Sequence, residues 1–235
     1  AMLAGAREAI GQLGNRTGAL LATTLIAKNW FAGEPWQAGI SGLFATRASM
    51  ELLTEADCVI GIGASLNHYT TEHGYLFPNA SYVHIDVQPH LRMSGGRVAE
   101  CYLQGDAKAT TETLNRLLAE RGGAAIGYRT PDTKAKLAED FDPREFPTED
   151  GFADPRQAAI ALDEGLPEDV SLIIGGGHFI SFPTMHMNRP RQVVSTVAFG
   201  CIGQGLGTAI GAAVGLGNKP AVLVEGDASA LMHIQ

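Results

Sequence analysis

Short apolar runs that alternate with helix-length segments constrain the fold of this chain most. Three runs, ALLATTLI (19–26), DCVIGIG (57–63) and SYVHIDV (81–87), are rich in β-branched residues and bounded by turn residues, which predicts buried strands. Helices are expected over 45–55 and over 106–121, the second with Asp106 as its N-cap. Alternation of this kind indicates an α/β fold with mostly parallel sheets covered by helices.

A second α/β unit follows a change of composition. Residues 122–151 are rich in charge, proline and glycine and show no strand pattern, apart from a short helix expected near 134–140. Asp154 and Pro155 then start a helix, and VSLIIGGG, RQVVST and AVLVEGD predict strands around the small-residue helix GQGLGTAIGAAVGLG. We therefore expect one domain over 1–121, a linker over 122–153 and a second domain over 154–235. Both ends of the chain resemble cuts through a larger protein, so the second domain is expected to be incomplete.

Composition limits the kinds of partner. The chain has 235 residues and a formal net charge of −8, and it contains no Lys/Arg run of the kind that binds nucleic acid. No apolar run is as long as a transmembrane helix, and no signal peptide opens the sequence, so no membrane partner is expected. Three widely spaced cysteines without a CxxC pair predict reduced thiols in a cytoplasmic protein, with Cys58 as a small core residue.

The strongest candidate site is the segment Glu225-Gly226-Asp227-Ala228-Ser229, which follows the strand AVLV. Ligands of open parallel sheets bind outside the carboxyl ends of the strands. A glycine there lets the backbone approach a phosphate, a carboxylate there can hold Mg²⁺, and the Ser229 hydroxyl and N–H would face the same phosphates. The alternative is an ordinary strand-to-helix turn with Asp227 as the N-cap.

Two other segments could belong to the same site. The small residues of FGCIGQGLG (199–207) allow either a flat ligand or another helix to come close. Gly175-Gly176-Gly177 ends the strand SLII and leaves a gap of the size of a phosphate or a ring, with His178 beside it. His178 is either structural or catalytic, and its position after the glycine turn favours neither, although functional loops cluster at strand ends.

The order and spacing of these segments resemble the cofactor-binding domain of thiamine-diphosphate enzymes of the acetolactate synthase and pyruvate decarboxylase group. The matching segments are Pro190-Arg191, Gly200-Cys201-Ile202-Gly203, TAIGA (208–212) and Gly226-Asp227-Ala228-Ser229. In the first half, ATTLIAKNWF, ADCVIGIGASL, YVHIDVQP and LQGDAKAT resemble the central domain of the acetolactate synthase large subunit. The resemblance implies two Rossmann-like parallel-sheet domains, the second truncated.

The resemblance also implies thiamine diphosphate and Mg²⁺ as cofactors. Asp227 would be a metal ligand that bridges to the diphosphate, and Gly226, Ala228 and Ser229 would contact the diphosphate through backbone or hydroxyl groups. Ala228 replaces the glycine that is usual in this motif, which is tolerable where the residue has a negative φ.

The other end of the cofactor is assigned to the loop over 200–203. Ile202 resembles the bulky residue that supports the bent cofactor, and the Gly200 carbonyl would accept a hydrogen bond from the aminopyrimidine. Cys201 replaces a serine there, and His178 resembles a residue near the substrate. FAD binding by the central domain is in doubt, because the turn over 64–68 lacks the charged residues of FAD-binding relatives.

The implied function is that of an acetolactate synthase-like transferase or lyase that decarboxylates a 2-oxo acid and passes the product to an acceptor, as a homodimer or homotetramer. The alternatives are a 2-oxo acid decarboxylase of the same family, a non-catalytic Rossmann-like nucleotide-binding protein that uses GIGAS as a degenerate dinucleotide turn, and a structural remnant without ligand. The activating glutamate and the second metal ligand of the family are expected outside these residues, so the chain alone is expected to be inactive.

Overall fold

The computed structural model describes residues 1–88, 96–123, 127–139, 146, 148–149, 151–197, 199–217 and 219–233. The chain forms two compact units, which are described separately. The first comprises Ala1–Thr24 and Gly33–Phe141, and the second comprises Leu25–Ala32 and Asp142–Gln235.

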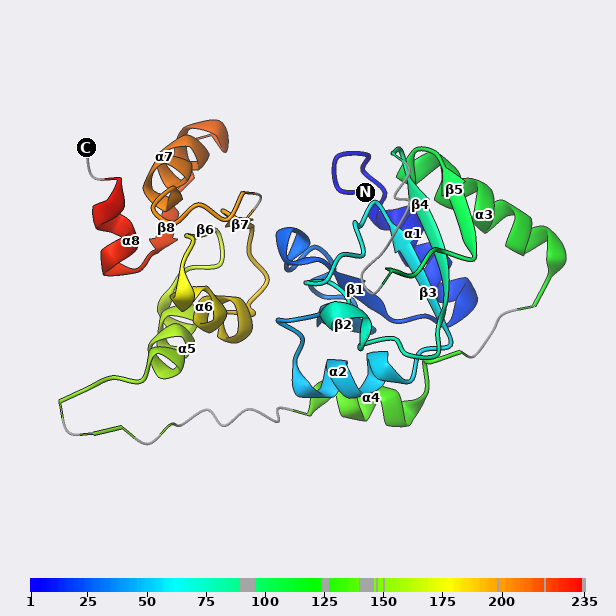
Figure 1. Cartoon of the computed structure of the whole chain (residues 1–235), viewed down its shortest axis with the longest axis horizontal. Helices are drawn as coiled ribbons and strands as arrows, with labels where there is room; N and C mark the ends of the chain where they lie inside the picture. Colours follow the sequence, from blue (N-terminus) through cyan, green and yellow to red (C-terminus); the bar gives the residue numbers. More distant parts are fainter. Residues whose placement is uncertain are drawn as a thin grey trace. The chain divides into compact units, whose positions relative to one another are not determined.

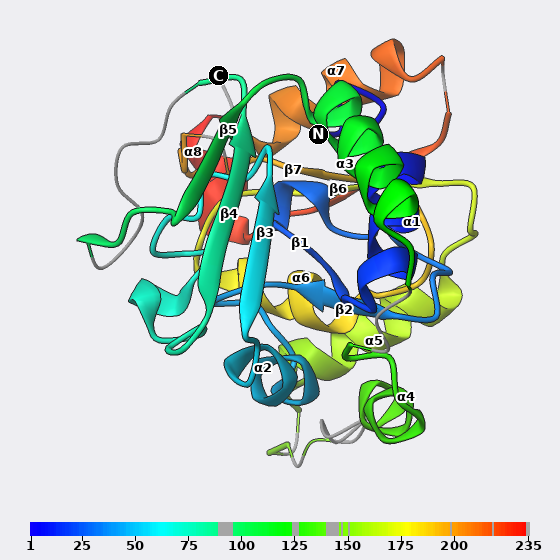
Figure 2. The same ribbon diagram turned by 90° about the vertical axis from the view of Figure 1, so that its right-hand side faces the viewer.

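The strands of the first unit form two small sheets in which every described pair is parallel. One sheet pairs β1 (Leu21–Thr23) with β2 (Gln37–Ile40), and the other has the order β3 (Cys58–Ile62), β4 (Ser81–Asp86), β5 (Cys101–Gln104) (Figure 2). The strand predicted over 19–26 is therefore shorter than expected, because the chain turns into the 3₁₀ helix η1 (Leu25–Ala27) directly after it.

The helices of the first unit are α1 (Arg7–Thr17), α2 (Arg47–Thr54), α3 (Ala107–Arg121) and α4 (Pro131–Ala138), with a 3₁₀ turn η2 (Glu72–Gly74). The Asp106 carboxylate accepts hydrogen bonds from Lys108 N and Ala109 N, which confirms it as the N-cap of α3. Helix α1 packs against α3, where Asn115 Nδ2 donates to Ala9 O at 2.8 Å.

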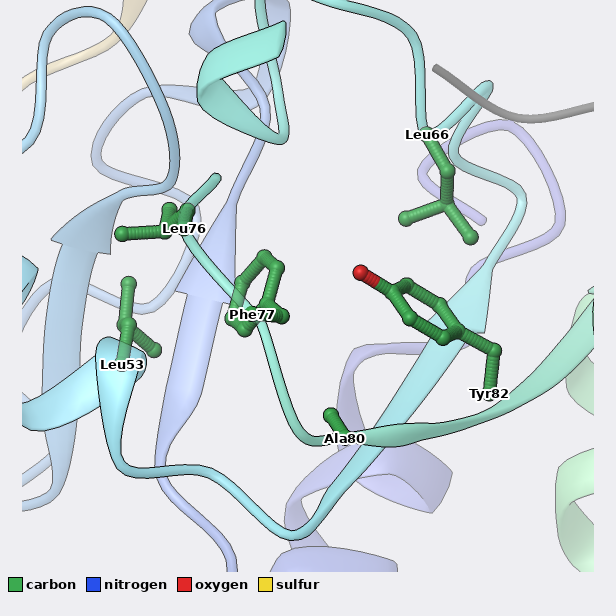
Figure 3. Packing of buried hydrophobic residues seen from close by; sticks show 6 residues of the cluster. All are labelled: Leu53, Leu66, Leu76, Phe77, Ala80 and Tyr82. Carbon is green, nitrogen blue, oxygen red and sulfur yellow. The ribbon is translucent and has the colours of Figure 1, made fainter. Parts of the chain in front are cut away.

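A cluster of buried side chains joins α2, β4 and the segment that connects β3 to β4. Figure 3 shows its members Leu53, Leu66, Leu76, Phe77, Ala80 and Tyr82. The rings of Phe77 and Tyr82 meet edge to face, with their centroids 6.3 Å apart, and the Arg97 guanidinium lies 4.6 Å from the Tyr82 ring centroid. These contacts fix the connecting segment against the sheet.

The second unit is built on a parallel sheet with the strand order β7 (Val193–Ser195), β6 (Ser171–Ile174), β8 (Ala221–Val224). Its helical elements are α5 (Pro155–Gly165), η4 (His178–Ile180), α6 (Ser181–His186), α7 (Gly205–Gly215) and α8 (Asp227–Met232). Figure 1 shows α5 and α6 on one side of this sheet and α7 on the other. Because all three strands run in the same direction, their carboxyl ends share one edge.

The α/β class and the parallel pairing predicted from the sequence are confirmed. Other details differ: β2, β5 and α6 were not predicted, and Cys58 is exposed at the first position of β3 rather than buried. The helix predicted near 134–140 begins earlier, at Pro131, with Thr130 as its N-cap, and Asp140 lies outside the described residues. Within the described part of the chain, no helix is both long and apolar enough to cross a membrane.

Candidate functional site

The three segments singled out in the sequence follow the strands of the second sheet. Gly175, Gly176 and Gly177 follow β6, the segment 225–229 follows β8, and the loop over 200–203 lies between β7 and α7. The structure brings all three together at the edge where parallel strands end, which is where open α/β sheets bind ligands.

One side chain connects these three segments. The Ser229 hydroxyl donates to Gly176 O at 2.9 Å and accepts from Gly203 N, also at 2.9 Å. Ser229 is 4% exposed, so both bonds are shielded from water. The candidate site is thus a hydrogen-bonded unit and not three independent loops.

Glycine is required where these loops meet. Gly200 and Gly203 have φ values of 74° and 96°, in the left-handed region that L side chains rarely adopt. A Cβ at Gly203 would also overlap the His233 ring, and a Cβ at Gly176 would lie 2.9 Å from Cys201 O. The loop over 200–203 therefore packs backbone to backbone against the turn after β6.

The start of α8 presents free backbone donors. The first hydrogen bond of this turn runs from Ala230 N to Gly226 O, so the N–H groups of Asp227, Ala228 and Ser229 precede the helical ladder. Such groups favour an anion. Gly226, and not Asp227, is the N-cap residue, and no side chain caps this helix, so the alternative role of Asp227 as N-cap is wrong. Ala228 lies inside α8 and does not have a positive φ, so alanine fits here without strain.

The Asp227 carboxylate is exposed and has no hydrogen-bond or ion-pair partner among the described residues. Over the same residues, no group of three or more His, Cys, Asp or Glu side chains could hold a metal ion. Asp227 therefore offers one carboxylate and not a complete protein cage. Mg²⁺ commonly takes one or two carboxylates and completes its shell with phosphate oxygens and water.

The remaining predicted residues differ in their surroundings. Gly200 and Ile202 are exposed, Ile202 at 44%, and Cys201 is half-buried. His178 is exposed at the start of η4, and its ring makes no hydrogen bond or ion pair with the described residues. The structure therefore links Ser229 to Gly176 and Gly203 but does not join His178 to them by a hydrogen bond.

Glu225 is a residue for which sequence reasoning predicted no role of its own. Both of its carboxyl oxygens are buried without a hydrogen-bond partner among the described residues. Its carboxyl group fills the space beside Gly175 and Gly205, where any Cβ would overlap it. Gly205 is the first residue of α7, so the Glu225 carboxyl group lies near the N-terminal end of that helix. This end of a helix favours negative charge. A charged residue at the end of the apolar strand AVLV was the signal available in the sequence.

Two family models match this chain. The model described as thiamine pyrophosphate enzyme, central domain, matches residues 1–117, and the C-terminal TPP binding domain matches residues 174–235, which include every residue of the site described above. The chain belongs to the thiamine pyrophosphate enzymes. Its first unit thus contains most of the family's central domain, and its second unit contains sequence of the family's cofactor-binding domain.

Curated relatives of this thiamine pyrophosphate enzyme agree with that assignment. Sulfoacetaldehyde acetyltransferase of Alcaligenes xylosoxydans xylosoxydans is 27% identical over 94% of this chain and 42% of the relative. The acetolactate synthase large subunit of Parasynechococcus marenigrum is 26% identical over 100% of the chain and 38% of the relative. The acetolactate synthase isozyme 2 large subunit of Escherichia coli is 28% identical over 87% and 36%. The chain therefore spans about two fifths of the length of these relatives.

Proposed function

We propose that the full-length protein is a thiamine-diphosphate- and Mg²⁺-dependent enzyme that decarboxylates a 2-oxo acid and transfers the product to an acceptor, as acetolactate synthase does. Family membership supports the cofactor, and the names of the relatives, a synthase and an acetyltransferase, favour transfer over simple decarboxylation. The same membership favours an enzyme over a nucleotide-binding module or a structural remnant.

The observation on which the proposal depends is the start of α8. Three N–H groups that precede the helical ladder lie beside the exposed Asp227 carboxylate. This combination suits a diphosphate together with one divalent cation, because the N–H groups donate to phosphate oxygens and the carboxylate binds the metal. Gly226, Ala228 and Ser229 would contact the diphosphate through their backbone.

The loop over 200–203 suits the rings of the cofactor. Thiamine diphosphate, when bound, supplies carbanion chemistry that no amino-acid side chain provides, and the protein supplies position and electrostatics. The Gly200 carbonyl would accept a hydrogen bond from the aminopyrimidine, the exposed Ile202 side chain would support the rings, and Cys201 between them would belong to the same cofactor-binding loop. His178 would lie near the substrate.

The location, the oligomeric state and the substrate of the protein are proposed from its family. We propose that the full-length protein is a cytoplasmic homodimer or homotetramer with a small 2-oxo acid substrate. The net charge of −8 favours neither nucleic acid nor an anionic membrane surface as a partner.

Titration of the full-length protein with thiamine diphosphate, with and without Mg²⁺, tests the cofactor assignment by calorimetry. Saturable binding that requires the metal is the expected result. Incubation of the loaded protein with pyruvate, with detection of both carbon dioxide and acetolactate, tests the reaction. Absence of saturable binding, or binding that is indifferent to metal, would contradict the proposal.

A further inference from the structure

We propose that the Ser229 hydroxyl is not a ligand of the diphosphate but the positioning group that fixes the loop over 200–203 relative to the Asp227 turn. The inference rests on the proposed function and assigns a distinct task to one atom of the site. It is based on the fact that this hydroxyl has only one proton to donate.

A serine hydroxyl has a single proton to donate. In this structure Ser229 Oγ donates that proton to Gly176 O at 2.9 Å. The oxygens of an ionised diphosphate only accept hydrogen bonds, so the hydroxyl could bind one only by abandoning Gly176. That exchange would leave a buried carbonyl without a partner, at a cost of about 1–3 kcal/mol.

The acceptor side of the same oxygen is also engaged. Gly203 N donates to Ser229 Oγ at 2.9 Å, and Ser229 as a whole is 4% exposed. No ligand can approach the hydroxyl without moving one of these two segments. Ser229 can still offer its backbone N–H to a diphosphate, because that group precedes the helical ladder of α8.

The three residues form a tight unit, which we call the Gly176–Ser229–Gly203 clamp. A Cβ at Gly203 would lie 3.1 Å from Ser229 O, and one at Gly176 would lie 2.9 Å from Cys201 O, so no larger residue could replace either glycine without displacing the backbone. Gly203 is the last residue of the loop over 200–203, which also contains Gly200 and Ile202. The clamp therefore determines where the ring-facing loop lies relative to the Asp227 carboxylate.

Loss of the clamp should affect position more than affinity. Ser229→Ala removes both hydrogen bonds but leaves Asp227 and the free N–H groups of α8 in place. A displacement of about 1 Å can lower a rate by about 100-fold. We expect the Kd for thiamine diphosphate with Mg²⁺ to change less than about threefold. The exchange of the cofactor's C2 proton with deuterated solvent, at saturating cofactor, should slow by about 10- to 100-fold.

A second measurement needs no cofactor. Amide hydrogen exchange of the ligand-free, full-length protein, followed by mass spectrometry on peptides that contain Gly203, should become faster in Ser229→Ala, because the Gly203 N–H loses its acceptor. Ser229→Cys, which retains a weak donor and acceptor of similar size, should lie between wild type and alanine, and it is the variant to use if Ser229→Ala does not fold. Thr208→Ala is the matched control, because the Thr208 hydroxyl donates to Gln204 O one turn earlier and bonds to no other described residue.

Two results would overturn the inference. One is a Ser229→Ala variant whose cofactor affinity falls more than about tenfold while C2 exchange at saturation stays normal, since that pattern identifies a diphosphate ligand. The other is a variant with unchanged C2 exchange and unchanged amide exchange. If the wild-type protein binds no thiamine diphosphate, the proposed function fails by itself, and the amide-exchange comparison still decides whether the clamp exists.

Discussion

Asp227 and Ser229 lie two residues apart, but their side chains have opposite surroundings. Residues at positions i and i+2 of a helix do not share a face. Ser229 is buried and hydrogen-bonded to two other segments, whereas Asp227 is exposed and has no partner among the described residues. One short turn therefore separates a group that holds the site together from a group that is available to a ligand.

The metal assignment of Asp227 predicts a selective loss. In the full-length protein, Asp227→Asn should weaken Mg²⁺-dependent binding of thiamine diphosphate by at least about tenfold, or about 1.4 kcal/mol, because a neutral amide is a poorer Mg²⁺ ligand. The free energy of unfolding of the ligand-free protein should fall by no more than about 1 kcal/mol, since the carboxylate has no described partner to lose beyond the N-terminal end of α8. Asp169→Asn, at another exposed position, is the control for charge, and equal affinity in the two variants would refute the assignment.

The buried carboxyl group of Glu225 predicts a gain in stability. A carboxyl group that is buried without a hydrogen-bond partner is costlier to the fold than an amide of the same shape, which cannot bring a charge into the interior. Glu225→Gln should raise the free energy of unfolding by about 1–3 kcal/mol, measured by thermal melting in the absence of cofactor. Glu168→Gln makes the same substitution at an exposed position and is the control. A Glu225→Gln protein that melts below Glu168→Gln would show that the carboxyl group stabilises the fold.

At the scale of elements, local signals determined which segments could be predicted. Helix α3 was predictable because Asp106 supplies a side-chain cap, and β3 and β4 were predictable because their β-branched runs end in turns. Strands β2 and β5 have only four residues each, QAGI and CYLQ, and α6 contains a proline within six residues. Segments that short take their structure from the neighbours against which they pair or pack, and a sequence pattern does not contain that information.

The candidate site was predictable where it depends on the ends of strands and helices, and not where it depends on contacts between distant segments. Gly175, Gly203 and Asp227 each follow or precede a recognisable strand or helix, and the ends of parallel strands meet at one edge of a sheet. The hydrogen bonds of Ser229 were not predictable, because their partners are 26 and 53 residues away and depend on how the backbone packs. The burial of Glu225 likewise depends on two glycines that are distant in sequence.

The segment after β3 leads to a prediction about flavin. Leu66 has a φ of 49° and is 3% exposed, and its side chain covers Gly61, where a Cβ would lie 2.8 Å from Leu66 Cδ1. Asn67 Oδ1 accepts from Tyr69 N and Thr70 N, so its oxygen is used within the turn. The turn over 64–68 contains neither arginine nor aspartate for a flavin nucleotide.

We therefore expect the purified full-length protein to be colourless, with no flavin absorbance in the visible range. The protein should be denatured and filtered, and the filtrate examined for flavin fluorescence. As a reference, an FAD-containing acetolactate synthase should be treated in the same way. Release of flavin in amounts comparable to the protein would contradict this prediction.

At the scale of the whole molecule, one short segment stands apart from its neighbours in the chain. Leu25–Ala32 belongs to the second unit although the residues on either side belong to the first. Lys28 Nζ donates to Asn188 Oδ1 at 2.7 Å, and Asn29 Nδ2 donates to Arg189 O at 3.0 Å, across 160 positions of sequence. Lys28 is 6% exposed, and burial lowers its pKa from the ordinary value of 10.5 to about 8, although the nearby Asp163 carboxylate opposes that shift.

The lowered pKa of Lys28 makes stability depend on pH with a definite sign. Between about pH 8 and 10.5 the amine is neutral in the folded state and protonated in the unfolded state, so the unfolded state binds one more proton. The contribution of Lys28 to the free energy of unfolding therefore rises through that window, by about 3 kcal/mol in total, and is constant below it. The difference in urea unfolding between wild type and Lys28→Met, measured from pH 7 to about pH 10, should show this rise, whereas the exposed Lys134→Met should run parallel to wild type. A Lys28→Met curve that also runs parallel to wild type would mean that the Lys28 amine keeps its ordinary pKa, and that the segment is held to the second unit without burial of a neutral amine.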